Sequence, residues 1–306
     1  MKFDIIGKRF WFFLISGLLV LASIISLATV GLKPGIEFSS GSMLTVRFEQ
    51  VVDYSQFKEE IASLGYGGAI IQHTEAGDYL IRTKELTDEE KTQLETALKA
   101  RFGQLSEASF SSVSPQAAAE TINNAAIAVA VASIGILLYI TWAFRRMPKP
   151  FRYGVCAVIA LIHDALVALG VFSILGAILG WETNLMFITG VLAVIGYSVN
   201  NTVVIFDRIR ENLTKGVSAS FETVVSNSLV ETLSRSMNTS LTTLITVLAI
   251  LLFVGSTIQN FAVVLLVGII AGTFDSVCVA PGLLVVWDKG EWGRFIPWSK
   301  PSVAKA

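Results

Sequence analysis

The stretch Asn184-Leu-Met-Phe-Ile-Thr-Gly-Val-Leu-Ala-Val-Ile-Gly-Tyr-Ser-Val-Asn-Asn-Thr-Val-Val-Ile-Phe206 decides the fold class, because it carries no charged residue. A bilayer core about 30 Å thick is crossed by about 20 helical residues, so this stretch is long enough to span a membrane. Further apolar segments of similar length lie on both sides of it. The six segments are 10–32, 125–144, 153–175, 184–206, 238–254 and 261–287. The sequence therefore predicts an α-helical integral membrane protein with six transmembrane helices.

The composition of the chain agrees with that class. Charged residues make up 15% of the 306 residues and hydrophobic residues 53%, whereas a soluble domain carries roughly 25% charged residues. This deficit excludes an ordinary soluble enzyme, a disordered chain and a nucleic-acid-binding protein. Cys156 and Cys278 both lie in apolar runs, which argues against a disulfide framework or a metal site and favours buried apolar side chains.

The first apolar segment is interpreted as a retained span. It is longer than the roughly 7–15 apolar residues of a signal peptide, and no small-residue cleavage site follows it. The alternative, a cleaved signal peptide, is less favoured.

Lysine and arginine predict the orientation. They form four groups: Lys2, Lys8 and Arg9; Arg145, Arg146, Lys149 and Arg152; Arg208, Arg210, Lys215 and Arg235; and Lys289, Arg294, Lys300 and Lys305. The short connections at 179–183 and 255–260 carry none. By the positive-inside rule, both termini lie in the cytoplasm and the long segment after the first span lies outside.

These assignments give a domain plan. Residues 1–32 are the cytoplasmic N-terminus and first span, 33–120 an extracytoplasmic domain, 121–287 spans two to six, and 288–306 a cytoplasmic tail. Within the spans, 207–235 is a cytoplasmic amphipathic connection. Its apolar residues recur every fourth position, which predicts a helix lying along the membrane surface: Leu213, Val217, Phe221, Val225 and Leu229.

The extracytoplasmic segment predicts a small α+β domain. Asp53 with Gln56, and Thr87 with Glu90, are the residue pairs that typically begin helices. Alternating or apolar runs predict strands at 43–48, 69–74, 78–83 and 107–113. The order β-α-β-β-α-β is the ferredoxin-like arrangement. The segment contains no catalytic cluster, and His73 is interpreted as an exposed strand residue.

Ionisable residues inside the spans are the functional candidates, because a charge in the bilayer centre is costly. His163 and Asp164 lie in the third span and Asp275 in the sixth. A rise of about 1.5 Å per residue places Asp164 and Asp275 roughly 18 and 21 Å from the outer face, level enough to meet if the two spans pack together. A buried carboxyl group can exchange a proton near neutral pH, which predicts a proton path. The alternative is that each acid only hydrogen-bonds a neighbouring helix.

Polar residues in the fourth and fifth spans are weaker candidates. The same depth counting places Asn201 near 25 Å and Arg235 near 30 Å, in the inner half of the membrane. Asn200 and Asn201 are uncharged and favour helix–helix hydrogen bonding, and Arg235 could extend its charge to the cytoplasmic headgroups. Small residues four apart, Gly176/Gly180 and Gly268/Gly272, predict close helix approach.

Several of these runs resemble a known family. They are Ile195-Gly-Tyr-Ser-Val-Asn-Asn-Thr-Val-Val-Ile-Phe-Asp-Arg-Ile-Arg-Glu-Asn212, Glu231-Thr-Leu-Ser-Arg-Ser-Met-Asn-Thr-Ser-Leu-Thr-Thr243, Gly35-Ile-Glu-Phe-Ser-Ser-Gly41 and Leu161-Ile-His-Asp164. Together they resemble the SecF branch of the SecD/SecF family of protein-export membrane subunits, which belongs to the resistance-nodulation-division (RND) superfamily. The similarity covers nearly the whole chain.

The resemblance implies an RND-type half of six spans with a ferredoxin-like domain after the first. It implies a partner, SecD, and work beside the SecYEG channel and SecA on an exported polypeptide in the cytoplasmic (inner) membrane, with YidC and YajC as further candidate partners. It implies a motor subunit driven by the proton-motive force, not an enzyme, with H⁺ as coupling ion and no cofactor. Two alternatives remain: half of an RND-type exporter of small molecules or lipids, and a structural membrane scaffold.

Two departures from the family pattern matter. The resemblance implies a proton-relay aspartate where this chain has Asn201, with Arg235 matching its arginine partner, and small polar residues near Asp275. We hypothesise that Asp275, with Asp164, replaces the missing carboxylate. One alternative is that SecD supplies all the proton chemistry. Another is that Na⁺ is the coupling ion, bound by oxygen atoms of Asn200, Asn201 and Thr202.

Overall fold

The computed structural model describes residues 4–74, 77–253 and 258–294. Within these ranges it contains six helical segments long and apolar enough to cross a membrane. They are α1 (Arg9–Thr29), α5 (Pro115–Ala143), α6 (Phe151–Leu179), α7 (Leu185–Thr214), α8 (Phe221–Phe253), and α9 (Gln259–Cys278) continued by α10 (Ala280–Lys289). The six-span prediction is confirmed. Lys2, Lys300, Lys305 and residues 255–257 of the predicted 255–260 connection lie outside the described residues.

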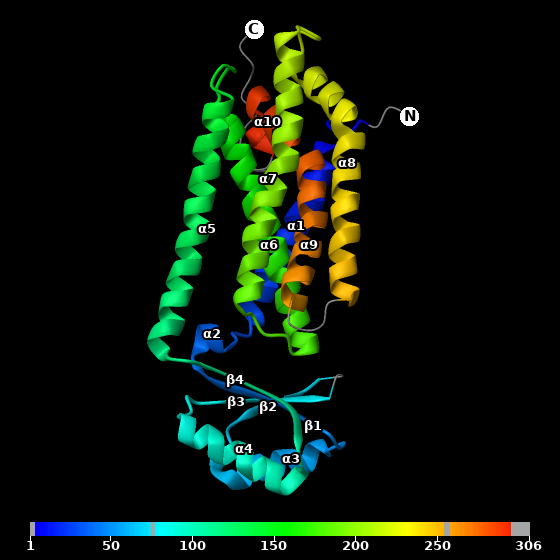
Figure 1. The fold of residues 1–306 in the computed structure, drawn as a ribbon. Coiled ribbons are helices and arrows are strands. Elements are labelled where there is room, and N and C mark those ends of the chain that lie inside the picture. The colour runs from blue at the N-terminus through cyan, green and yellow to red at the C-terminus, as the bar shows by residue number, and fades with distance from the viewer. Residues whose placement is uncertain (1–3, 75–76, 254–257, 295–306) are drawn as a thin grey trace. The chain divides into compact units, whose positions relative to one another are not determined.

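The chain forms two compact units. One comprises residues 1–33, 127–181 and 185–306, and the other comprises residues 34–126 and 182–184. In the first unit, α9 packs against α6, α7 and α8, and α6 also packs against α1. These contacts bring the third, fourth and sixth spans together at the centre of the helical unit, where Figure 1 shows α6, α7 and α9 running side by side.

The sixth span is interrupted between α9 and α10. Val279 ends α9 with φ −102° and ψ −57°, and α10 begins with Pro281 at its first turn. Proline has no backbone N–H, so the hydrogen-bond ladder cannot run unbroken through this point. The break lies one turn after Asp275, whose carbonyl accepts the Val279 N–H at 2.9 Å.

The connection between the fourth and fifth spans differs from the prediction. Residues 207–235 do not form a separate helix along the membrane surface. They are the last two turns of α7, a short link at 215–220, and the first half of a continuous α8 that begins at Phe221. Val225 and Leu229 are buried in the hydrophobic core of the helical unit. The four-residue spacing therefore reflects packing between helices.

The basic groups meet at one end of the helical unit. Arg9, at the start of α1, forms ion pairs with Glu222 at the start of α8 (2.8 Å) and with Glu291 in the 3₁₀ turn after α10 (2.5 Å). Arg152, at the start of α6, lies 3.9 Å from Asp288 near the end of α10. The starts of α1, α6 and α8 and the end of α10 therefore share one end, as the charge pattern requires.

The second unit has the predicted strand and helix order. It contains α2 (Ile36–Ser39), β1 (Gly41–Phe48), α3 (Tyr54–Ile61) with a short π-helical turn (Ala62–Tyr66), β2 (Ile70–His73), β3 (Asp78–Thr83), α4 (Asp88–Phe102) and β4 (Leu105–Val113). The sheet order is β2-β3-β1-β4, with each neighbouring pair antiparallel. Figure 1 shows α3 and α4 covering one face of the sheet. This is the ferredoxin-like arrangement.

Caps and apolar stripes explain these elements. The Asp53 carboxylate accepts hydrogen bonds from the first backbone N–H groups of α3, and Thr87 forms a complete capping box with Glu90 at the start of α4. Phe57 of α3 is fully buried against the sheet, with its ring 4.3 Å from that of Tyr79. His73 is exposed and stacks on Tyr79, so its interpretation as an exposed strand residue is confirmed.

The glycine prediction holds only in part, whereas the prediction of two buried, unbonded cysteines is confirmed. A Cβ atom at Gly268 would lie 2.1 Å from the side chain of Val194, which confirms close approach of α7 and α9. Gly180 plays another role, because it ends α6 in the left-handed conformation (φ 72°) with nothing near its Cβ position. Cys156 and Cys278 are buried and unbonded to each other.

Candidate functional site

Three ionisable side chains meet in the centre of the helical unit. Nδ1 of His163 lies 3.0 Å from Oδ1 of Asp164, its neighbour on α6, and 3.8 Å from Oδ1 of Asp275 on α9. Asp164 and Asp275 are fully buried and His163 is 6% exposed. Depth counting placed the two acids level enough to meet if the third and sixth spans pack together, and in the structure these spans do pack together. We call His163, Asp164 and Asp275 the buried triad.

A third helix contributes to the same place. Ser198 of α7 donates its hydroxyl hydrogen to Oδ2 of Asp164 at 2.5 Å. Gly272 of α9 leaves room for this contact, because a Cβ atom there would lie 3.1 Å from Oδ2 of Asp164 and 3.2 Å from Cβ of Ser198. Ser198 lies in the polar run of the fourth span but was not named from the sequence as a site residue. The sequence did contain an indication of its role, because Ser198 is a hydroxyl residue within the uncharged stretch of the fourth span.

Several polar atoms of the buried triad have no hydrogen-bond partner among the described residues. They are both carboxylate oxygens of Asp275 and Nε2 of His163. Two buried carboxylates without a fixed cation beside them cannot both remain ionised at low cost. Chemically, the triad is therefore suited to hold protons. Its ligand atoms also lie within 4.8 Å of one another, close enough to share a single cation.

Further hydroxyl groups extend this polar centre along α7 and α9. The hydroxyls of Thr202 and Ser276 lie 2.9 Å apart, and that of Ser276 donates to the backbone carbonyl of Ser198 at 3.4 Å. Asn201 is buried and donates through Nδ2 to Ser240 of α8 at 3.1 Å. Asn201 thus lies in the interior but bonds to α8, and no described hydrogen bond joins it to the triad.

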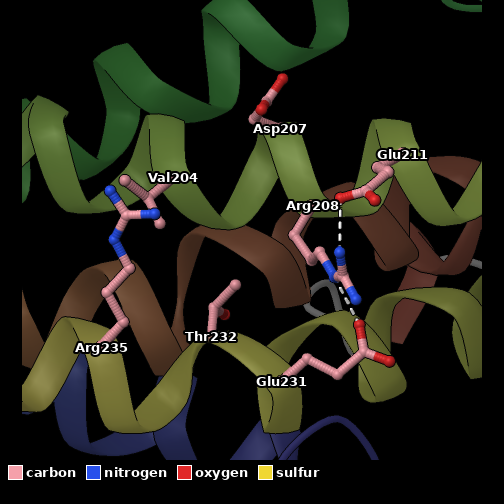
Figure 2. A pocket seen from close by; sticks show the side chains of 7 residues that line it. All are labelled: Val204, Asp207, Arg208, Glu211, Glu231, Thr232 and Arg235. Carbon is pink, nitrogen blue, oxygen red and sulfur yellow. Dashed lines mark hydrogen bonds and ion pairs between the residues drawn. The ribbon is translucent and has the colours of Figure 1, made fainter.

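The structure does not bring Asn200 or Arg235 into the triad. Both side chains are exposed on the surface of the helical unit. Arg235 lines a groove of about 360 Å³ between α7 and α8, where its guanidinium group lies beside Val204 (Figure 2). Depth counting placed Asn201 and Arg235 at comparable levels, but it carries no information about which way each side chain faces.

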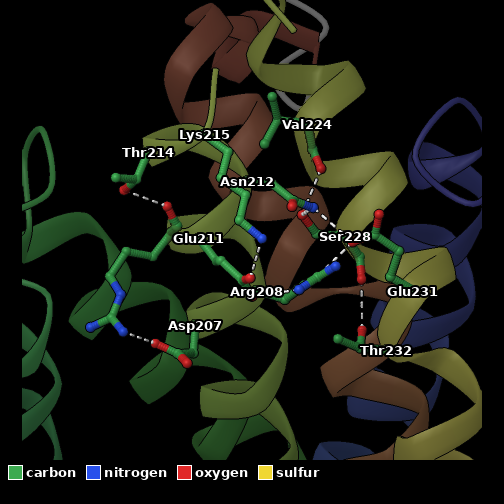
Figure 3. A network of polar contacts seen from close by, with 11 residues as sticks. Asp207, Arg208, Glu211, Asn212, Thr214, Lys215, Val224, Ser228, Glu231 and Thr232 are labelled. Atoms are coloured by element: carbon green, nitrogen blue, oxygen red, sulfur yellow. Dashed lines mark hydrogen bonds and ion pairs between the residues drawn. The ribbon is translucent and has the colours of Figure 1, made fainter. Parts of the chain in front are cut away.

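A network of charged and polar side chains links the C-terminal end of α7 to the first half of α8 (Figure 3). Arg208 donates to Glu211 on its own helix and to Glu231 on α8. Asn212 is buried and donates through Nδ2 to both Ser228 (3.0 Å) and Glu231 (2.8 Å). Glu231 and Asn212 were not selected from the sequence as site residues. The network joins the long motif of the fourth span to the motif that opens the fifth.

Comparisons with known proteins agree with the motifs. A profile described as protein export membrane protein SecD/SecF, C-terminal, matches residues 93–290, and one described as the SecD/SecF GG motif matches residues 25–50. A protein translocase subunit SecF from Thermobaculum terrenum is 41% identical over 98% of this chain and 99% of its own length. The corresponding protein from Anaerolinea thermophila is 39% identical over the same shares.

Longer proteins match over part of their length. A crystal structure of SecDF, described as a translocon-associated membrane protein, from Thermus thermophilus superposes with a TM-score of 0.82 at 31% identity. The match covers 94% of this chain and 39% of that one. The protein translocase subunit SecDF of Bacillus subtilis is 33% identical over 94% of this chain and 38% of its own length.

Proposed function

Because this chain belongs to the SecD/SecF family of protein-export membrane proteins, we propose that it works with a SecD partner to complete Sec-dependent export, driven by the proton-motive force. Its relatives carry the name of translocase subunits, which supports a role in protein translocation. In this role the chain makes and breaks no covalent bond. It converts movement of an ion into movement of helices.

The observation that carries the proposal is the buried triad. Two fully buried carboxyl groups on different spans share one histidine, and the side-chain oxygens of Asp275 have no described hydrogen-bond partner. Loading or removing a proton changes the charge between α6 and α9. Each charge state favours a different packing of these helices, and alternation between them couples the proton gradient to motion.

Neutral substitutions of the two acids test this coupling. Asp164→Asn and Asp275→Asn keep the side-chain size but cannot exchange a proton, so each should abolish stimulation of export by the proton-motive force. Export into inverted membrane vesicles with and without an ionophore measures it. Asp207→Asn is the control, because Asp207 is exposed and pairs only with Arg210 on its own helix among the described contacts.

The same experiment decides whether Asp275 replaces the family carboxylate missing at Asn201. If Asp275→Asn leaves proton-dependent export unchanged while Asp164→Asn abolishes it, the replacement hypothesis is wrong. If both variants export normally, SecD supplies the proton chemistry. Exposed Arg235 then offers a cation to a carboxylate of that partner, and Arg235→Gln should abolish export instead.

Sodium is the alternative coupling ion. Thr202 and Asn201 are buried, but Asn200 faces outward, so the three do not converge on one site. This arrangement favours H⁺ over Na⁺ at these residues. Replacing Na⁺ by K⁺ in the export assay should leave the rate unchanged, whereas a loss of export would support sodium.

The proposed setting is the cytoplasmic membrane, with both termini in the cytoplasm and the ferredoxin-like unit outside. The gathering of Arg9 and Arg152 at one end of the helical unit supports this orientation. Single cysteines at Ser63 and Lys215 should label with an impermeant reagent only from outside and only from inside, respectively.

Co-purification distinguishes this function from the RND-type exporter alternative. Recovery with SecD and SecYEG supports the export role, with SecA, YidC and YajC as further partners to be sought. If neither SecD nor SecYEG is recovered with the chain, the export role is contradicted. The exporter of small molecules or lipids would then be the better supported function.

A further inference from the structure

The buried triad has the ligand types and the spacing of a transition-metal site. It offers one imidazole nitrogen and two carboxylates, which come from α6 and α9. In a tetrahedral site with bonds of about 2.0–2.1 Å, neighbouring ligand atoms lie roughly 3.3–3.5 Å apart. Nδ1 of His163 lies 3.0 Å from Oδ1 of Asp164 and 3.8 Å from Oδ1 of Asp275, so the two distances bracket that value. An ion between these atoms reaches all three after small side-chain shifts.

The charge balance of the triad points to a further cation. Asp275 is fully buried, and neither of its carboxylate oxygens has a hydrogen-bond partner among the described residues. Within the described ranges, His163 is the ion-pair partner of both acids. One histidine carries at most one positive charge, so it cannot balance two carboxylates. Buried charges in proteins are paired or coordinate metals, and a dication between the two acids makes the cluster neutral.

The histidine determines which class of cation fits. Imidazole nitrogen is a ligand for Zn²⁺ and related transition metals, whereas hard cations such as Mg²⁺ and Ca²⁺ prefer oxygen. Nε2 of His163 has no described partner, so it can hold the ring proton while Nδ1 faces the metal. The second oxygen of Asp275 or a water molecule supplies the fourth ligand of a zinc site.

Ser198 provides the support that a metal-binding carboxylate requires. Such carboxylates are themselves hydrogen-bonded, which fixes their orientation toward the metal. Ser198 donates to Oδ2 of Asp164 at 2.5 Å, while Oδ1 of the same group is the atom that faces His163. One oxygen of Asp164 is therefore held by α7, and the other is directed at the proposed ion.

We propose that the buried triad binds a transition-metal dication of the Zn²⁺ class, and that the bound ion inhibits export by clamping α6 to α9. Metal bonds to two helices oppose the change in packing on which coupling depends. The ion is thus a regulator of the triad and not a resident cofactor. Its effect on export rests on the proposed function, whereas the binding of metal does not.

Co²⁺ binding to the full-length protein in detergent, purified with a histidine-free tag, tests the site. The complex should show the strong visible absorption of four-coordinate Co²⁺. Zn²⁺ should abolish this absorption, and a large excess of Mg²⁺ should not. His163→Ala and Asp275→Asn should each weaken Co²⁺ binding by at least about a hundredfold, since even outer partners of a metal site contribute about 10–100-fold. His73→Ala is the matched control, because it removes the other histidine of the chain, an exposed one, and should bind Co²⁺ normally.

Thermal unfolding shows whether each variant is folded. Added Zn²⁺ should raise the unfolding midpoint of the unsubstituted protein and of His73→Ala, because a ligand that binds the folded state stabilises it. The midpoints of folded His163→Ala and Asp275→Asn should not change. Normal Co²⁺ binding in these two variants would overturn the proposal. A sulfur-to-cobalt charge-transfer band would also overturn it, because the ion would then lie on Cys156 or Cys278.

Export into inverted vesicles measures the inhibition. Zn²⁺ should lower the proton-stimulated rate several-fold, a chelator should restore it, and the rate that remains with an ionophore should not change. An equal loss of the ionophore-resistant rate would overturn the inhibitory role. If no metal binds and Asp275→Asn still abolishes proton-dependent export, the metal site is wrong and the proposed function stands. If metal binds and both acid variants export normally, the proposed proton role fails and the site stands.

Discussion

Ser198 on α7 donates a hydrogen bond of 2.5 Å to Asp164 on α6 in a fully buried contact. His163 links the same carboxyl group to α9, because its Nδ1 lies 3.0 Å from Oδ1 of Asp164 and 3.8 Å from Oδ1 of Asp275. Three spans thus meet at one acid. A change in the charge of Asp164 therefore alters contacts of α6, α7 and α9 together. For this reason, the residues that position this carboxyl group are the most informative ones to substitute.

Gly272→Ala should impair proton-dependent export without removing any polar group. The new Cβ atom would lie 3.1 Å from Oδ2 of Asp164, tighter than ordinary contact, so the carboxyl group or Ser198 must shift. We expect a fall of about tenfold in the proton-stimulated rate, equivalent to roughly 1.4 kcal/mol. Vesicle export with and without an ionophore measures it.

Gly135→Ala is the control for this substitution. Gly135 is exposed on α5 and has no atom within 4 Å of its Cβ position. Alanine there should leave export unchanged. Equal rates for Gly272→Ala and Gly135→Ala would show that the position of the Asp164 carboxyl group does not limit coupling.

Ser198→Ala removes the hydroxyl donor of Asp164 and should reduce coupling more than export as a whole. A hydrogen bond to a charged group contributes about 1.5–3 kcal/mol, so we expect the proton-stimulated component to drop by about tenfold or more. Basal export without a proton gradient should persist. The readout is the ratio of rates with and without the gradient, at matched amounts of protein in the membrane.

Ser133→Ala serves as its matched control, since the one hydrogen bond that the described residues offer the Ser133 hydroxyl is within α5, to the carbonyl of Val129. A normal ratio in Ser198→Ala would mean that the contact with Asp164 is structural and carries no part of the coupling.

The sequence predicted the outer unit well, for physical reasons. Its strands alternate in polarity, and its two main helices begin at capping residues that work through local contacts, such as Asp53 and Thr87. Local patterns are enough for these features. Depth counting placed Asp164 and Asp275 at similar levels, but their meeting also depends on the packing of α6 against α9.

The α7–α8 region could not be predicted in the same way. The charged residues after Phe206 suggested that the fourth span ends there and a connecting segment begins. A helix can continue past its apolar segment, however, and α7 does so to Thr214. The direction in which the Arg235 side chain points depends on how α8 is rotated about its own axis. That rotation is set by packing against helices that are remote in sequence. Ser198 was missed because its role depends on Asp164 of another helix.

Asn212→Ala should destabilise the helical unit. Asn212 is 2% exposed and joins α7 to both Ser228 and Glu231 of α8. Alanine leaves the buried Ser228 hydroxyl without its donor, which costs about 1–3 kcal/mol. Thermal unfolding of the purified protein in detergent should show a lower midpoint. Arg210→Ala is the comparison, because the exposed pair of Arg210 with Asp207 should contribute little.

An unchanged midpoint in Asn212→Ala would mean that the ends of α7 and α8 are held by their apolar contacts. The charges of the network in Figure 3 would then serve another purpose than stability.

Thr87→Ala should loosen α4 without unfolding the outer unit. Thr87 accepts the Glu90 N–H at 3.3 Å, and the Glu90 carboxylate accepts the Thr87 N–H at 2.8 Å, so the substitution breaks one half of a capping box. Loss of an N-cap costs about 1 kcal/mol. Hydrogen exchange of the full-length protein should show faster exchange at the first turn of α4, by about fivefold. Thr96→Ala, in the exposed middle of α4, should leave that turn unchanged, since among the described residues its hydroxyl donates only to the Thr92 carbonyl within the helix. Equal exchange in both variants would show that packing of Leu94 and Leu98 under the sheet, not the cap, fixes the start of this helix.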